Sequence, residues 1–299
     1  MSVITNVALA GATGNLGTPI LEHLLKSGFR VTVLTRQDST HRFPANVAVK
    51  AVDYGSVESL AAALQGQDAV VSALGFGGFS KQLPLVEAAA KARVKRFIPS
   101  EFGANSENPK TSKLPIFADK AAVREALIKE AAKGSLSYTF INTGPFFEMS
   151  LKSGLSLDPV NKSVTLYDGG ERPYSVTTLE GLGRAVVGTL GKLEETRNRA
   201  VYIQSAAPTL KRLKATAEKV TGTAWQAKEV SIENDVLAPV SIEQKKKTAD
   251  PNRPFLPFLI ASIWGEGYGG HFEKLDNELL GIKELTEAEI ESAVAAATK

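Results

Sequence analysis

Residues 7–17, Val7-Ala-Leu-Ala-Gly11-Ala-Thr-Gly14-Asn-Leu-Gly17, decide the fold that this sequence predicts. An apolar run at the start indicates a buried strand, and the glycines that follow at a spacing of three indicate a tight turn. Apolar residues then recur at helical spacing over 20–25. The order strand, glycine-rich turn, helix is typical of a dinucleotide-binding unit, in which turn N–H groups and the helix N-terminus bind a pyrophosphate.

The same residues also fit an ordinary tight turn between a strand and a helix, because a glycine-rich turn alone is a weak signal. Context favours nucleotide binding, since strand, turn, helix and second strand follow in the expected order. We therefore expect the turn to contact the cofactor through Gly11, Thr13, Gly14, Asn15, Leu16 and Gly17.

The end of the second strand bears on which cofactor is bound. An NAD site usually places a carboxylate there, on the ribose 2′-hydroxyl, whereas this sequence has Arg36. A guanidinium pairs with a 2′-phosphate, so the sequence predicts NADPH; a solvated surface arginine is the alternative. Further cofactor contacts are expected at the ends of the third and fourth strands, from Asp53, Ser72, Ala73, Leu74 and Gly75.

Strands and helices alternate over the first 145 residues. Strands are predicted at 3–10, 30–34, 47–52, 69–73, 95–99 and 137–142, and helices near 16–27, 56–64, 80–92 and 118–133. This alternation requires right-handed parallel crossovers, which predicts an α/β fold with a Rossmann-type doubly wound parallel sheet.

The pattern is looser after Pro145. We expect a strand end and a helix over 174–190, a strand at 200–205, a helix at 209–221 and a packed loop at 251–258. The organisation predicted is an NADP-binding domain at 1–150, to which 174–205 returns, and a smaller C-terminal substrate-binding lobe formed by 151–173 and 206–299.

Composition excludes several classes of function. The chain of 299 residues has no cysteine and a net charge of +3 with dispersed basic residues, so we expect no disulfide, thiolate metal site or nucleic-acid partner. No metal-ligand spacing joins His23, His41 and His271. Without a membrane-length apolar run or a secretory signal, we expect no membrane association and a cytoplasmic location. Monomer and homodimer both stay open.

Residues 94–103, Val-Lys-Arg-Phe-Ile-Pro-Ser-Glu-Phe-Gly, carry a long and specific resemblance. They resemble a signature of the isoflavone reductase-like family, which includes phenylcoumaran benzylic ether reductases and belongs to the wider NmrA-like group of atypical short-chain dehydrogenases. Further similar stretches lie at 52–60, 142–147 and 178–184. The resemblance implies an NADPH-binding Rossmann domain and aromatic or phenolic substrates.

The resemblance also implies a catalytic lysine, which matches Lys120 in Lys120-Ala-Ala-Val-Arg124. Helical geometry places Lys120 on the apolar stripe of Val123 and Leu127, where burial lowers a lysine pKa, while Lys129 points away. A lysine extending outward from the helix end is the alternative. Ile116 stands where ordinary short-chain dehydrogenases carry a tyrosine, an absence that the resembled group shares.

Aromatic residues at expected strand ends are candidates for the substrate site. We expect Phe79, Phe102 and Phe147 to bind substrate, and Pro145 and Phe146, in the similar stretch 142–147, to contact the cofactor. Core packing is the alternative for each phenylalanine.

The sequence predicts an NADPH-dependent reductase of small aromatic molecules. In it, Lys120 acts as general acid or base and also contacts the cofactor. The alternative is an NmrA-like sensor that binds the dinucleotide without turning it over and signals through a protein partner. A sensor needs the glycine-rich turn but no acid-base group, so Lys120 favours the enzyme. A sugar-nucleotide epimerase is disfavoured by the missing tyrosine. The sequence departs from the resembled pattern at Ala12 and Asn15, where plant members usually have glycine and an aromatic residue. It also lacks the lysine soon after Arg36 that often holds the 2′-phosphate in such reductases, and Arg42 is a candidate substitute for that lysine.

Overall fold

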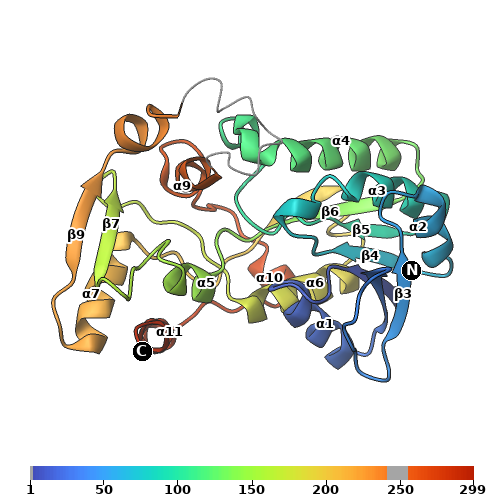
Figure 1. The fold of residues 1–299 in the computed structure, drawn as a ribbon, viewed down its shortest axis with the longest axis horizontal. Coiled ribbons are helices and arrows are strands. Elements are labelled where there is room, and N and C mark those ends of the chain that lie inside the picture. Colours follow the sequence, from blue (N-terminus) through green and yellow to red (C-terminus); the bar gives the residue numbers. More distant parts are fainter. Residues whose placement is uncertain (1–2, 241–254) are drawn as a thin grey trace.

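A parallel sheet of seven strands forms the larger half of the molecule in the computed structural model, which describes residues 3–240 and 255–299 (Figure 1). Its order is β3-β2-β1-β4-β5-β6-β8. The strands are β1 (Asn6–Ala10), β2 (Arg30–Arg36), β3 (Ala48–Val52), β4 (Ala69–Ser72), β5 (Arg96–Ile98), β6 (Ser137–Asn142) and β8 (Arg199–Tyr202). The strand order reverses at β1, where ligands of such sheets bind at the carboxyl ends. The doubly wound sheet is thereby confirmed.

Helices cover both faces of the sheet because each face is apolar. On one face pack α1 (Gly17–Lys26) and α6 (Leu179–Gly191). On the other pack α2 (Val57–Ala63), α3 (Gln82–Lys91) and α4 (Ala118–Ala132). The connection from β4 to α3 contains the short 3₁₀ helix η1 (Phe76–Gly78), and two more, η2 (Thr111–Lys113) and η3 (Pro115–Phe117), lead into α4.

A second core lies beyond the carboxyl ends of the strands, at the left of Figure 1. Its two-stranded parallel sheet pairs β7 (Ser163–Tyr167) with β9 (Gln226–Val230). Around it lie α5 (Phe147–Lys152), α7 (Leu210–Thr221), the π-helical turn η4 (Ile232–Leu237), α9 (Phe255–Trp264) and α11 (Glu287–Ala297). The sequence did not predict β7 or β9, which have only five residues each.

Three segments differ from the sequence-based expectation. Residues 255–258 begin helix α9 rather than a loop, because Pro257 falls in the first turn, where its missing N–H costs no helical bond; 251–254 lie outside the described residues. In 174–177, where a strand end was expected, only Val176 and Thr177 make isolated bridges. Helix α10 (Asn277–Leu280) packs on α6, so this part of 206–299 returns to the larger half. Among the described residues, every helix is too short or too polar to cross a membrane.

Candidate active site

The glycine-rich turn between β1 and α1 owes its shape to two close approaches. Gly11 has φ of +80°, and a Cβ there would lie 2.5 Å from the carbonyl oxygen of Ala73. A Cβ on Gly17 would lie 1.9 Å from the carbonyl oxygen of Gly11. Helix α1 has no side-chain cap and no acidic residue in its first turn. The N–H groups of Asn15, Leu16 and Gly17 have no backbone partner in the described part of the chain, so they and the positive dipole end suit a phosphate, and the residues present fit a dinucleotide.

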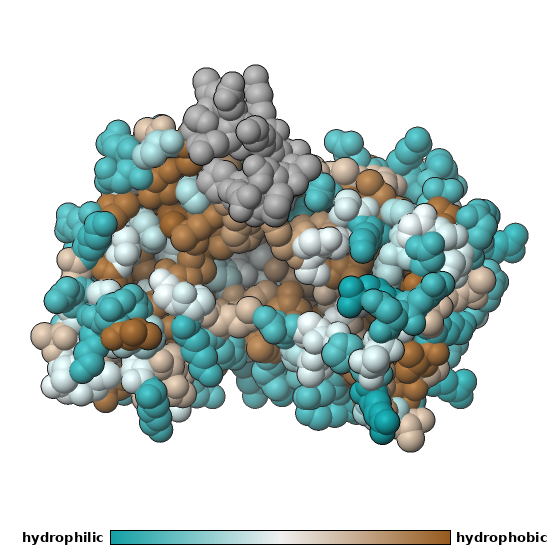
Figure 2. Space-filling view, viewed as in Figure 1, coloured by the Kyte–Doolittle hydropathy of each residue, from teal (hydrophilic) through white to brown (hydrophobic). Residues whose placement is uncertain are grey.

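A cavity of about 820 Å³ extends from this turn to the second core. The turn contributes Gly14, Asn15 and Leu16, and the end of β4 contributes residues 73–75. The other walls include Lys120, Pro145 and Phe146 and a group of apolar side chains that comprises Phe76, Phe79, Phe102, Met149, Leu155, Phe255, Leu259 and Ile263. Hydrophobic residues also gather in the hollow between the two halves of the surface in Figure 2.

Lys120 is buried at the wall of this cavity, with 7% of its surface exposed. Its Nζ donates a hydrogen bond to the backbone carbonyl of Glu101 and lies 5.1 Å from the ring centroid of Phe79. Burial lowers the pKa of Lys120; the Glu101 carboxylate opposes this shift, and the Arg124 guanidinium adds to it. The amine is thus held at one point beside the cavity and releases its proton more readily than a surface lysine.

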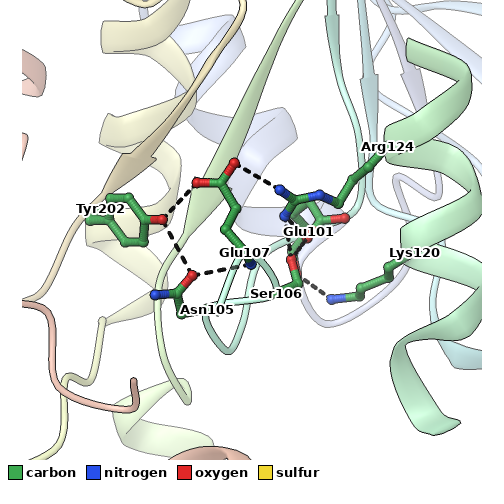
Figure 3. A network of polar contacts seen from close by, with 7 residues as sticks. All are labelled: Glu101, Asn105, Ser106, Glu107, Lys120, Arg124 and Tyr202. Carbon is green, nitrogen blue, oxygen red and sulfur yellow. Dashed lines mark hydrogen bonds and ion pairs between the residues drawn. The ribbon is translucent and has the colours of Figure 1, made fainter. Parts of the chain in front are cut away.

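A polar network fixes the loop that holds Lys120 (Figure 3). The guanidinium of Arg124 donates to Ser106 Oγ at 2.7 Å, lies 3.7 Å from the Glu101 carboxylate, and donates to Glu107 at 2.7 Å. Ser106 Oγ in turn donates to the carboxylate of Glu101. Tyr202 at the end of β8 donates to Glu107 at 2.8 Å. The network therefore joins α4, the loop after β5 and β8 around the lysine.

The other predicted residues divide between the cavity and two smaller hollows beside it. Gly11, Thr13 and Arg36 line a hollow of about 220 Å³, and Arg36 and Asp53 line one of about 360 Å³. Gly17 packs beneath the turn, where only a glycine fits. Ser72 is fully buried in β4 and lines none of these spaces.

One substrate prediction needs correction. Phe79 and Phe102 line the large cavity, but Phe147 is fully buried in the second core. Phe146, its neighbour, faces the cavity instead, because Phe147 is the first residue of α5 and packs inward. Sequence reasoning also did not identify the Glu101 carboxylate or Met149 and Leu259 as site residues. A buried carboxylate in 94–103 could have been sought as the partner of Arg124; the other two carry no signal beyond apolar character.

The profile of the NmrA-like family matches residues 5–248. The chain is 33% identical over 297 residues to "Oxidoreductase poxI" of Penicillium oxalicum, covering 95% of this chain and 92% of that protein. It is 34% identical over 284 residues to "Oxidoreductase aprR" of Aspergillus flavus, covering 92% and 94%. A phenylcoumaran benzylic ether reductase of Pinus taeda is 28% identical over 229 residues, covering 69% and 71%.

Solved structures share the fold over almost the whole chain. The structure described as "AtPrR2 with NADP+ and (+)pinoresinol" has a TM-score of 0.79 at 24% identity and covers 99% of this chain and 100% of that one. An isoflavone reductase structure has a TM-score of 0.78 at 20% identity, covering 98% and 99%. At these identities the likeness concerns the fold.

Proposed function

Since this chain belongs to the NmrA-like family and is an oxidoreductase, we propose that it reduces small aromatic or phenolic molecules with hydride from NADPH, using Lys120 as general acid. The observation that carries the proposal is one continuous cavity, of about 820 Å³, whose wall includes the glycine-rich turn, Lys120 and several phenylalanines. Cofactor, proton donor and substrate would meet in that space.

The residues at the turn would hold the cofactor. The backbone N–H groups of Asn15 and Leu16 and the uncapped start of α1 would bind the pyrophosphate, and Arg36 would bind the 2′-phosphate. Residues 73–75 and Pro145 line the same cavity as the turn and Lys120, and the nicotinamide end would lie beside Lys120. When bound, NADPH supplies a hydride to an electron-poor carbon of the substrate.

Lys120 would handle the proton. Its Nζ is held by the Glu101 carbonyl, and its lowered pKa favours release of a proton to a substrate oxygen or carbon that has gained negative charge. The rings of Phe79 and Phe117, with centroids 5.1 and 6.0 Å from the amine, would limit the access of water to this transfer.

The apolar wall supports an aromatic substrate class. Phe76 and Phe255 meet edge to face with ring centroids 4.7 Å apart, and both line the cavity. Flat apolar rings bind between such side chains through burial and edge or face contacts. The relative from Pinus taeda, a phenylcoumaran benzylic ether reductase, agrees in substrate class.

The test is oxidation of NADPH by the full-length protein, followed at the nicotinamide absorbance, against aromatic enones, isoflavones and benzylic ethers. NADPH affinity is measured in parallel by nicotinamide fluorescence. We expect NADPH to be oxidised in the presence of at least one of these compound classes, with one equivalent of reduced product formed for each NADPH consumed. Tight NADPH binding with no oxidation by any compound would contradict the proposal and favour a sensing role.

A further inference from the structure

Two adjacent hollows at the carboxyl end of β2 share two cationic side chains. Arg36 and Lys81 line both the hollow of about 220 Å³ beside the glycine-rich turn and the hollow of about 360 Å³ beside β3. Arg36 ends β2, whereas Lys81 directly precedes α3. The fold thus brings together two cations that lie 45 positions apart in the chain.

Charge distinguishes the two hollows. Asp38 and Asp53 line the one beside β3 together with Arg36 and Lys81. None of the described residues that line the hollow beside the turn is acidic, and His41 lies there with the two cations. The glycine-rich turn itself contributes Gly11 and Thr13 to this hollow of about 220 Å³. A dianion next to the turn would therefore face positive charge and no carboxylate.

Both cations are available to a ligand. The guanidinium of Arg36 has one loose ion pair, 3.8 Å from Asp38, and its side chain is 71% exposed. Within residues 3–240 and 255–299, no ion pair or side-chain hydrogen bond is found for Lys81, whereas Lys91 at the far end of α3 pairs with Glu58 at 3.3 Å. Arg42, the substitute suggested by sequence, lines neither hollow.

We propose that Lys81 is the second cationic ligand of the 2′-phosphate of the cofactor, opposite Arg36, and sets the preference for NADPH over NADH. The inference rests on the proposed function, because it assumes a nicotinamide dinucleotide bound at the turn. Arg36 offers a planar fork and Lys81 a compact point charge, so the two approach a phosphate from different sides. NADH lacks that phosphate and gains nothing from Lys81.

The test is a fluorescence titration of NADPH and NADH into wild type, Lys81→Ala, Lys81→Arg, Arg36→Ala and the control Lys91→Ala, with folding checked by thermal melting. We expect Lys81→Ala to weaken NADPH binding by about 10- to 100-fold and to change the NADH Kd by less than about threefold. Lys81→Arg and Lys91→Ala should keep the NADPH preference of the wild type.

The outcomes separate this inference from the function it rests on. If wild type prefers NADPH, Arg36→Ala loses the preference and Lys81→Ala keeps it, Lys81 is not a ligand and the proposed function stands. Equal weakening of both nucleotides in a folded Lys81→Ala protein would also overturn the inference. A wild type that binds neither nucleotide would overturn the proposed function itself.

Discussion

Lys120 and Arg124 lie one helical turn apart on α4, and both act on the loop that contains Glu101. The lysine donates to the backbone carbonyl of Glu101, and the arginine lies 3.7 Å from its carboxylate. The two side chains of the Lys-x-x-x-Arg pattern therefore hold opposite ends of one residue. This gives a physical reason for the spacing, because i and i+4 share a helix face.

The pH dependence of turnover tests this arrangement. A general acid must be protonated, so kcat/KM should fall as pH rises through the pKa of Lys120, and burial places that fall below the ordinary value of 10.5. Glu101→Gln removes a charge that favours the protonated amine and should move the fall to lower pH. Arg124→Met removes a charge that disfavours it and should move the fall to higher pH.

The measurement is the pH–rate profile of each variant over the range in which all three proteins stay folded by circular dichroism. Opposite displacement of the basic limb is the signature of electrostatic control of Lys120. If the basic limb of the profile stays at the wild-type pH in both variants, a group other than Lys120 controls it.

At this scale the sequence predicted Lys120 correctly as a buried residue, since helical periodicity alone places it beside Val123 and Leu127. It could not distinguish Phe146 from Phe147. Two adjacent aromatic residues at the start of a helix point in different directions, and which one reaches the cavity depends on the packing of α5.

Among elements, the turn before α1 is tightly constrained. Gly17→Ala would push a methyl group into the Gly11 carbonyl, 1.9 Å away, and so displace the backbone that we propose binds phosphate. We expect a loss of about 1–3 kcal/mol in the free energy of unfolding, together with weaker NADPH binding. Gly191→Ala, at the end of α6 with open space around it, is the matched control and should bind NADPH normally. Normal binding by a stable Gly17→Ala protein would show that the turn is less constrained than described.

Arg96 on β5 connects the sheet to the segment after α6. It is 1% exposed, donates to Ser137, Thr139 and Thr196, and burial lowers its pKa to about 10. Arg96→Leu would leave buried acceptors unpaired, so we expect about 2–3 kcal/mol less stability in urea unfolding. Lys91→Ala removes only a surface pair and should cost less than about 1 kcal/mol. Similar losses in both variants would contradict this account.

Strong periodicity explains which elements the sequence predicted. The six strands expected before residue 145 are all present, because each carries apolar residues between clear turn residues; all are largely buried except the edge strand β3, which is mostly exposed. Strand β9 escaped prediction because its exposed residues Gln226, Ala227, Lys228 and Glu229 carry no apolar alternation. Its pairing with β7 is a tertiary contact between distant segments.

At the scale of the whole molecule, the cavity is shared by the sheet half and the second core. Phe76 belongs to the first and Phe255 to the second, and the two rings touch across the space. Sequence could suggest aromatic residues at strand ends, but the approach of α9 to η1 depends on the packed fold.

Phe255→Ala tests that shared wall. Removing the ring should raise the KM for the aromatic substrate about tenfold, with the Kd for NADPH unchanged, because Phe255 lines the cavity from α9, a helix that contributes none of the proposed cofactor contacts. Leu256→Ala is the control, since its side chain is 54% exposed and does not line the cavity. Equal effects of the two substitutions on KM would place the substrate elsewhere.

The most direct test of the central claim is the single-turnover rate of NADPH oxidation in Lys120→Met, which keeps the unbranched side chain up to the ε position but has no amine. Lys129→Met, an exposed position of the same helix, is the control. The account predicts that Lys120→Met binds NADPH but oxidises it about 10²- to 10⁴-fold more slowly, while Lys129→Met matches wild type. A Lys120→Met protein that binds NADPH and oxidises it at the wild-type rate would contradict the account.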